Sequence, residues 1–229
     1  MRVRLFRINH GACPYLPNRT WVTNAFQVDR LPESLYESMI AEGWRRSGTS
    51  FYRNHCPGCD LCIPIRVPTD RFRPSKSQRR TLRRNADVSV RIGPLEGAEE
   101  AYELYYLYNT TRHGEHDTAS PAGFERFLLH SPIDTRMMRY YVGERLVGIG
   151  WVDVLSDGLS SVYFVFDPEE SSRSLGTYSA MQEIETARRM GKNWLYLGFY
   201  VPGSPKMSYK ARFRPYQLLE DGRWMEYAE

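Results

Sequence analysis

The sequence predicts an α+β fold with a mainly antiparallel, mixed sheet and a small Cys/Arg-rich domain at the N-terminus. Turn residues separate three strand-like runs in the C-terminal half, and helical patterns flank these runs. The N-terminal part instead carries three closely spaced cysteines and a dense run of arginines. A chain of 229 residues suits one large domain or two small ones.

The N-terminal part is predicted to hold two helices and three strands. Pro32 and Gly43 bracket the first helix, since proline favours the first turn and glycine the position after the last. Ser75 and Gln78 form a capping-box pattern, which predicts that the second helix begins directly after Ser75, at Lys76. The expected helices cover residues 31–42 and 76–84, and the expected strands cover residues 50–54, 63–69 and 88–92.

The C-terminal part is predicted to be an antiparallel meander flanked by helices. Gly93 and Pro94 mark the division, so the expected domains are residues 1–92 and 93–229. Hairpin signals at residues 143–144 and 156–158 join the central strands. The expected helices are residues 96–112, one opening at 120–121 and residues 175–190, and the expected strands are residues 136–142, 145–155, 159–166 and 193–199. By analogy, this element order is that of a GNAT-like acyltransferase fold.

Positive charge is concentrated in one segment. Residues 66–91 hold nine Lys or Arg against two Asp, about +7, although the whole chain carries only +4. A local field of this kind indicates a polyanionic partner, first of all nucleic acid. Five of these cations fall on one face of the second predicted helix and are the candidates for contacts with nucleic-acid phosphates: Lys76, Arg79, Arg80, Arg83 and Arg84. The alternative is an ordinary solvated helix surface.

The sequence has no run of about 18 apolar residues, so no membrane span is predicted. The N-terminal residues lack the apolar core of a signal peptide. We therefore expect a cytoplasmic protein with no membrane partner. In a reducing compartment, clustered cysteines indicate a metal or redox site and not a disulfide framework. The four cysteines that would suit a structural zinc or an iron–sulfur cluster are Cys13, Cys56, Cys59 and Cys62. The alternative is a loop of reduced, partly buried thiols.

Several long blocks of the sequence resemble the aminoacyl-tRNA–protein transferase family, which includes eukaryotic arginyltransferases and bacterial leucyltransferases. The matching blocks are the cysteine cluster and residues 13–16, 43–48, 52–53, 72–80, 160–164, 167–168, 173–178, 196–200 and 206–215. The resemblance implies that an amino acid passes from charged tRNA to the α-amine of a protein's N-terminal residue, in the N-degron pathway. The short chain looks like the bacterial form, which uses leucyl-tRNA and acceptors that begin with Asp or Glu, and the transfer needs no cofactor.

Residue chemistry adds candidates for the acceptor side. An acidic N-terminal residue needs Arg or Lys in a partly desolvated pocket. The candidates are Arg45, Arg46, Arg53, Arg66, Lys206 and Arg212. An α-amine has a pKa of about 7.7–8.0, so a strong general base is not obligatory, and orientation and oxyanion stabilisation should carry much of the catalysis.

The donor side calls for aromatic side chains and an anion site. Bases at the single-stranded tRNA end stack on aromatic rings, and the loop opening the helix at residue 175 offers free backbone amides to a phosphate. The remaining tRNA-binding candidates are Arg173, Ser174, Gly176 and Tyr178. The catalytic candidates are Tyr163, Asp167, Tyr200, Tyr209 and Lys210. For a tyrosine the alternative is core packing, and for Asp167 it is capping of a turn.

Three other functions are compatible with the sequence. The first is an arginyl-tRNA–protein transferase. The second is a non-enzymatic RNA-binding module with a cysteine-bound metal. The third is an acetyltransferase that uses acetyl-coenzyme A, although the Arg/Gln-x-x-Gly-x-Gly/Ala signature of such enzymes is not intact around residues 173–176.

Overall fold

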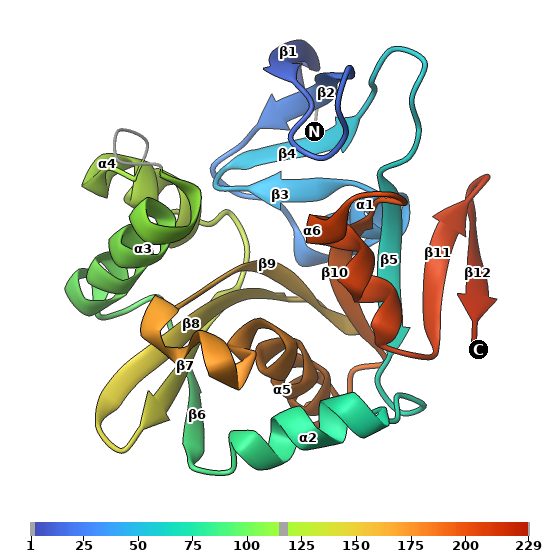
Figure 1. Ribbon diagram of the computed structural model, residues 1–229. Coiled ribbons are helices and arrows are strands. Elements are labelled where there is room, and N and C mark those ends of the chain that lie inside the picture. The colour runs from blue at the N-terminus through green and yellow to red at the C-terminus, as the bar shows by residue number, and fades with distance from the viewer. Residues whose placement is uncertain (1–2, 115–118, 229) are drawn as a thin grey trace.

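A computed structural model of the chain describes residues 3–114 and 119–228 (Figure 1). The strands of these described segments are β1 (Phe6–Ala12), β2 (Thr20–Gln27), β3 (Arg45–Ser47), β4 (Ser50–Asn54), β5 (Ile63–Pro68), β6 (Val88–Gly93), β7 (Thr135–Val142), β8 (Arg145–Val154), β9 (Gly158–Phe166), β10 (Trp194–Tyr200), β11 (Tyr216–Glu220) and β12 (Arg223–Tyr227). The α-helices are α1 (Glu33–Ala41), α2 (Lys76–Arg84), α3 (Ala98–His113), α4 (Pro121–Phe124), α5 (Leu175–Arg189) and α6 (Pro205–Ser208). The shorter helical segments are η1 (Glu125–Leu129), η2 (Pro168–Arg173) and η3 (Tyr209–Arg212).

The strands form two sheets, and the predicted α+β class is confirmed. The smaller sheet has the order β1-β2-β4-β3, and the larger has the order β12-β11-β5-β10-β9-β8-β7-β6. The pairing in the larger sheet is antiparallel except between β9 and β10. This sheet includes β5 and β6, so it takes strands from both sides of the predicted division at residue 93.

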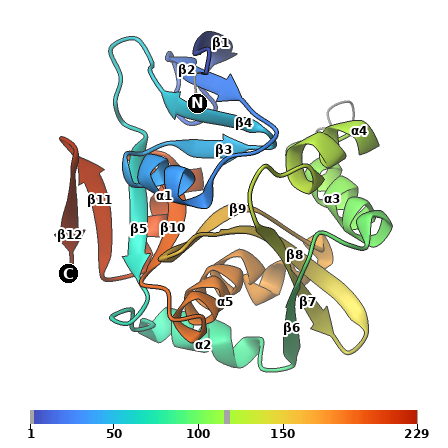
Figure 2. The same ribbon diagram turned by 180° about the vertical axis from the view of Figure 1, so that it is seen from behind.

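Both faces of the large sheet are covered (Figures 1 and 2). Met138 and Tyr140 of β7 pack toward α5, whereas Met137, the residue before Met138, packs with α3 and α4 on the other face. This alternation follows from the two-residue period of a strand. The small sheet and α1 cover the part of the second face near β10, where Tyr36 and Phe51 pack with Tyr196.

Helix α2 begins as the capping box predicts. The Ser75 hydroxyl accepts a hydrogen bond from the Gln78 backbone N–H at 3.3 Å, and the Gln78 side chain accepts one from the Ser75 N–H at 2.8 Å. On the inner side of the helix Gln78 and Thr81 are buried, as is the C-cap residue Asn85, and Leu82 packs against the hydrophobic core. The five predicted tRNA-binding cations lie on the exposed side.

Some elements differ from those predicted. The helix opening at Ser120 has only four α-helical residues before it widens into the π-helical segment η1. Strands β1 to β3, β11 and β12 and the helical segments after β10 were not predicted. No helix in the described part of the chain is long and apolar enough to cross a membrane.

Candidate active site

The two central strands of the large sheet separate partway along their length. Parallel strands β9 and β10 pair at three positions, the last between Ser160 and Tyr196. Beyond these residues no β9–β10 pairing continues, and β10 shifts its register with β5 between Tyr196 and Gly198. Gly198 has φ +86°, a conformation that favours glycine. The separation leaves backbone groups inside the protein that need partners from side chains.

Arg45 of β3 supplies such partners. Its guanidinium donates from Nη1 to the Ser160 hydroxyl at 3.0 Å and from Nη2 to the Ser161 carbonyl at 2.5 Å. Only 8% of Arg45 is exposed, yet it forms no ion pair with a carboxylate of the described residues. A buried, unpaired guanidinium is a candidate for binding an anion or a developing oxyanion.

Lys210 of η3 reaches the same point from the other side. A Cβ at Gly198 would lie 3.4 Å from Lys210 Nζ and 3.5 Å from Arg45 Nη2, so glycine leaves the space that both cations occupy. Burial and the adjacent Arg45 charge lower the pKa of Lys210 to about 7, against the opposing effects of Glu183 and Cys62. An amine with this pKa can accept and return a proton near neutral pH.

Glu183 of α5 is a charged residue at this site that the sequence analysis missed. It is 1% exposed, and burial raises its pKa to about 8, against the opposing effects of Ser161, Arg45 and Lys210. A signal existed: Glu183 lies among Ala180, Ile184 and Ala187 on the buried side of α5, where a charged residue is unusual. Arg45, Lys210 and Glu183 thus converge on the separation of β9 and β10.

Tyr209, next to Lys210, borders a cavity of about 190 Å³ between α2, the start of α5 and η3. The Gln78 side chain of α2 donates to the Arg212 carbonyl at 3.1 Å and so holds η3 against α2. The cavity is polar, with side chains from Ser77, Thr81, Ser174 and Thr177 in its wall. The structure therefore brings the predicted tRNA-binding helix, the predicted donor loop and the predicted catalytic segment together.

All four cysteines line one larger cavity of about 910 Å³ beside the small sheet, together with Arg53. Burial and the three other cysteines raise the pKa of the Cys62 thiol to about 12. Among the described residues, no three His, Cys, Asp or Glu side chains come close enough together to hold a metal ion. The metal site therefore stays a prediction.

The other predicted acceptor-binding cations lie in different surroundings. Arg46 is bound by the buried Asp153 at 2.6 Å. Arg66 is half-buried, with its guanidinium 3.7 Å from the Trp194 ring centre and 4.2 Å from that of Trp224. Lys206 on α6 and Arg212 on η3 are exposed near Lys210 in the chain. Of this group, only Arg45 reaches the separation of β9 and β10, and Arg53 and Arg212 line the two cavities.

The remaining predicted tyrosines are partly or wholly packed. Tyr163 is half-buried and donates to the Asn109 side chain at 3.0 Å. Tyr178 is buried against Tyr140, and burial raises its pKa. Tyr200 at the end of β10 is half-buried beside the core that includes Tyr216. Their predicted roles stay predictions.

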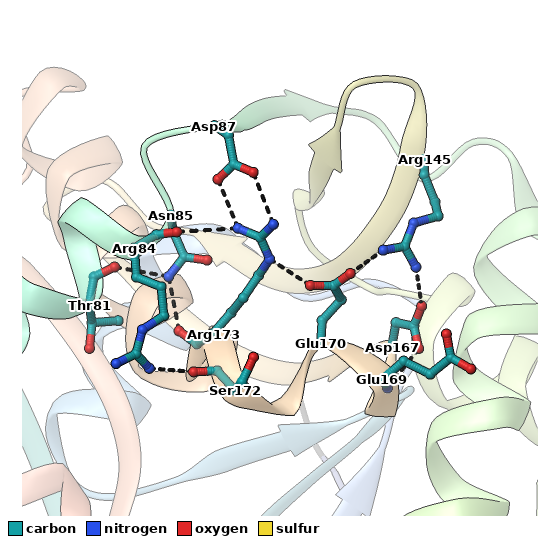
Figure 3. Close-up of polar contacts among 10 residues, drawn as sticks. All are labelled: Thr81, Arg84, Asn85, Asp87, Arg145, Asp167, Glu169, Glu170, Ser172 and Arg173. Carbon is teal, nitrogen blue, oxygen red and sulfur yellow. Dashed lines mark hydrogen bonds and ion pairs between the residues drawn. The ribbon is translucent and has the colours of Figure 1, made fainter.

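Ion pairs hold the predicted donor loop in place (Figure 3). Arg145 bridges Asp167 and Glu170, and Arg173 bridges Glu170 and Asp87. Asp167 also accepts from the Glu169 backbone N–H at 3.0 Å, which is the capping role given as its alternative.

The network continues into α2 and ends at the start of α5. Arg84 donates to the Ser172 carbonyl, and the Asn85 side chain donates to the Arg173 carbonyl at 2.9 Å. Ser174, with φ +58°, and Gly176 lie at the beginning of α5. The loop that carries these predicted tRNA-binding residues is therefore fixed against the basic helix.

The separated central strands and the covered mixed sheet define a GNAT-like acyltransferase fold. FemX matches 90% of this chain and 82% of its own with a TM-score of 0.53 and 10% identity. A DUF2156 domain from Agrobacterium fabrum matches 88% of this chain and 65% of its own with a TM-score of 0.53 and 12% identity. At these identities the likeness concerns the fold alone, and it confirms the predicted fold.

Sequence comparison gives the family. Residues 11–80 match "Arginine-tRNA-protein transferase, N terminus" and residues 100–220 match "Arginine-tRNA-protein transferase, C terminus". Relatives named aspartate/glutamate leucyltransferase are 40% identical in Marinobacter nauticus (93% of this chain, 92% of the relative) and 38% identical in Chromobacterium violaceum (95% and 91%). The chain belongs to this aminoacyl-tRNA–protein transferase family, which confirms the resemblance and the assignment as an aminoacyltransferase.

Proposed function

We propose that this protein transfers leucine from leucyl-tRNA to the α-amine of proteins that begin with Asp or Glu, within the N-degron pathway of the cytoplasm. Relatives of nearly the same length and 34–41% identity carry the name aspartate/glutamate leucyltransferase. The observation that carries the proposal is the meeting of Arg45 and Lys210 where β9 and β10 separate, between a basic helix and a large cavity.

The donor tRNA approaches along α2. The five exposed cations of this helix form no ion pair with a carboxylate of the described chain, so their charge is available to phosphates. The cavity between α2, α5 and η3 has hydroxyl groups and the Tyr209 ring in its wall, which suits the terminal nucleoside of the tRNA. From there the ester carbonyl reaches Lys210, the next residue along η3.

The acceptor N-terminus enters from the cavity beside the small sheet. Arg53 is exposed in this cavity and is the predicted cation best placed to bind an acidic side chain there. Cys62, in the wall of the same cavity, is near enough to act electrostatically on Lys210. The acceptor amine would thus arrive at Lys210 from the side opposite the donor.

The reaction forms one C–N bond and breaks one C–O bond. The acceptor amine attacks the leucyl carbonyl carbon, the ester bond to the ribose oxygen breaks, and one amine proton ends on that oxygen. Lys210 in its neutral form takes the proton from the nitrogen and returns it to the leaving oxygen. Arg45 stabilises the negative charge that develops on the carbonyl oxygen. This balance needs no oxidant, reductant or cofactor.

The test is transfer of radiolabelled amino acid onto peptides that differ only in their first residue. Leucyl-, arginyl- and phenylalanyl-tRNA are supplied in parallel, and the acceptors begin with Asp, Glu or Ala. We expect transfer of leucine onto the Asp and Glu peptides alone. Transfer of arginine instead would favour the arginyltransferase alternative, in keeping with the match to arginine-tRNA-protein transferases. Tight tRNA binding without any transfer would favour an RNA-binding module.

A further inference from the structure

Strand β9 has an open edge in the middle of the large sheet. From Ser161 to Phe166 it pairs only with β8 among the described strands, because its pairing with β10 ends at Ser160. Ser161 and Phe164 remain partly exposed along this edge, although β9 is a central strand. In open sheets, ligands bind in the crevice where neighbouring strands diverge. The edge is therefore accessible to the reacting end of a substrate.

Arg45 and Glu183 approach this edge from opposite faces of the sheet. Side chains alternate along a strand, so Ser160 and Ser161 point to different faces. Arg45 binds the Ser160 hydroxyl from the side of the small sheet. Ser161 is paired with Val152, which packs in the core on the α5 side. Glu183 of α5 thus lies on the face of β9 opposite the Arg45 guanidinium, at the adjacent residue.

Two glycines of β8 shape the sheet surface under α5. Gly148 and Gly150 lie within the strand, where glycine often marks the close approach of another group. A Cβ at Gly148 would lie 3.1 Å from Phe164 Cζ, and a Cβ at Gly150 would lie 3.4 Å from Phe164 Cδ2. The same Cβ at Gly150 would lie 3.5 Å from Glu183 Oε1. Gly150 therefore brings an aromatic ring and a carboxyl group together beside the open edge.

The Glu183 carboxyl group lacks a partner within the described chain. It is 1% exposed, and neither of its oxygens has a hydrogen-bond partner among the described residues. The Ser161 side chain acts on it electrostatically but does not meet hydrogen-bond geometry. A buried carboxyl group without donors is costly, and an apolar residue would serve packing better. Beside a substrate edge, such a group is a candidate for binding a cationic group of the substrate.

We infer that the leucyl group of the donor binds over Gly150, where Phe164 packs against its isobutyl side chain and Glu183 accepts hydrogen bonds from its α-ammonium group. The inference rests on the proposed function, in which the leucyl carbonyl lies between Arg45 and Lys210. In a leucyl ester, the amino group and the side chain branch from the carbon next to that carbonyl. The donor therefore needs a cation-binding group and an apolar wall close to the reacting carbon, as the structure supplies them.

The protons balance within this contact. Burial raises the pKa of Glu183 to about 8, so the carboxyl group is mostly protonated in the free enzyme at pH 7. An uncharged α-amine of the leucyl ester takes that proton, which leaves an ammonium–carboxylate pair and draws no proton from solvent. No bond of the leucyl group forms or breaks in this step.

The contact with Glu183 selects a class of tRNA. A donor with a free α-amine can form the ion pair. In a peptidyl-tRNA or another N-acylated tRNA, the same nitrogen belongs to an amide and does not become ammonium. Glu183 would then stay buried without an ionic partner, which disfavours such a donor. The carboxyl group therefore favours aminoacyl-tRNA over N-acylated tRNA.

The first experiment compares leucyl-tRNA with N-acetyl-leucyl-tRNA as donors to a peptide that begins with Asp. For wild type, kcat/KM should be about 10- to 100-fold lower with the acetylated donor, the value of a hydrogen bond to a charged group. Glu183→Gln should lose a similar factor with leucyl-tRNA and little with the acetylated donor. Glu183→Asp should fall between Glu183→Gln and wild type. Glu185→Gln, on the same helix but at an exposed ion pair, should behave as wild type.

Two results would overturn the inference. Wild type could use both donors equally well, or Glu183→Gln could lose the same factor with both, as a merely structural residue would. If Glu183→Gln does not fold, the wild-type ratio and Glu183→Asp decide. A wild type that transfers nothing would refute the proposed function. The affinities of the two tRNAs without peptide, judged by the same ratios, then decide the inference separately.

The second experiment tests the contact with the side chain. Phe164→Ala removes the aromatic wall, so the preference in kcat/KM for leucyl-tRNA over phenylalanyl-tRNA should fall about 10-fold. Phe164→Leu keeps an apolar contact and should change the preference less. Tyr106→Ala removes a 41% exposed ring of α3 and should not change it. An unchanged preference for Phe164→Ala, or for Phe164→Leu if the alanine variant does not fold, would place the leucyl side chain elsewhere and overturn the inference.

Discussion

Arg45 and Arg46 are neighbours on β3, both more than 90% buried, and their surroundings differ completely. Arg46 donates two hydrogen bonds to Asp153, at 2.6 and 3.0 Å, and another to Thr135. Arg45 donates to the Ser160 hydroxyl and the Ser161 carbonyl oxygen, with Lys210 close by and no carboxylate of the described residues paired with it. The charge of Arg46 is therefore neutralised within the fold, whereas the charge of Arg45 remains available to a substrate.

The largest expected effect comes from breaking the satisfied pair. Arg46→Ala leaves the buried Asp153 carboxylate without its cation, which should lower the free energy of unfolding by about 3–5 kcal/mol. Urea denaturation measures this loss. The matched control replaces both partners, Arg46→Met with Asp153→Leu, and should recover much of the stability, because no unpaired charge remains. A loss below about 1 kcal/mol for Arg46→Ala would place this pair among ordinary surface contacts.

The next largest effect is a loss of transfer activity on substitution of Arg45, with little loss of stability. Arg45→Gln removes the cation but retains hydrogen-bond donors, so we expect kcat/KM to fall about 10²–10³-fold, as for loss of an oxyanion donor. Stability should change by less than about 1.5 kcal/mol, the net value of a hydrogen bond. Parallel transfer assays and urea curves check both values. An Arg45→Gln protein that is unstable but fully active when folded would erase the distinction between the two arginines.

The two arginines also show what the sequence could not supply. Both lie in the block 43–48 that resembles the family, and the sequence predicts the same role for both. Their surroundings differ because adjacent residues on a strand point to opposite sides. The partners on each side come from distant parts of the chain. Asp153 and Ser160 are more than 100 residues away in the chain. Only the packing of β3, a strand of the small sheet, against β8 and β9 of the large sheet distinguishes them.

Local signals were more reliable than distant ones. The capping box at Ser75 and Gln78 fixed the start of α2, and the turn residues located β7, β8 and β9, because each signal lies within a few residues of its effect. Strand β5 lies between β10 and β11, over 120 residues further along. No local pattern predicts that pairing, which places Cys62 and Lys210 near each other.

A smaller effect is expected on the salt dependence of tRNA binding, which compares the unpaired cations of α2 with the paired cations of α5. Arg79→Ala with Arg83→Ala should weaken tRNA binding and lower the slope of log K against log salt by about 1.5, since two phosphate contacts are lost. Binding titrations at several salt concentrations measure the slope. Arg188→Ala with Arg189→Ala removes two α5 cations that Glu185 already pairs, so it should change the slope less. Equal slopes for the two double variants would mean that α2 is not the RNA face.

The smallest effect concerns a paired cation beside that helix. Asp87 is exposed and pairs with Arg173, whose guanidinium also forms an ion pair with Glu170 (Figure 3). Asp87→Asn should raise tRNA affinity by roughly two- to three-fold at low salt, because it removes one negative charge next to α2 and frees two donors of Arg173. Unfolding should become easier by less than about 1 kcal/mol, since solvent screens an exposed pair.

The pH dependence of that small loss identifies its cause. Hydrogen bonding to Arg173 lowers the pKa of Asp87, so the pair contributes at neutral pH, and its contribution disappears as pH falls through the folded-state pKa. Wild type and Asp87→Asn should therefore differ slightly in urea midpoint at pH 7 and converge at acid pH. A difference that persists there, or an affinity for tRNA that falls, would mean that Asp87 supports the loop before α5 and does not restrain the charge of Arg173.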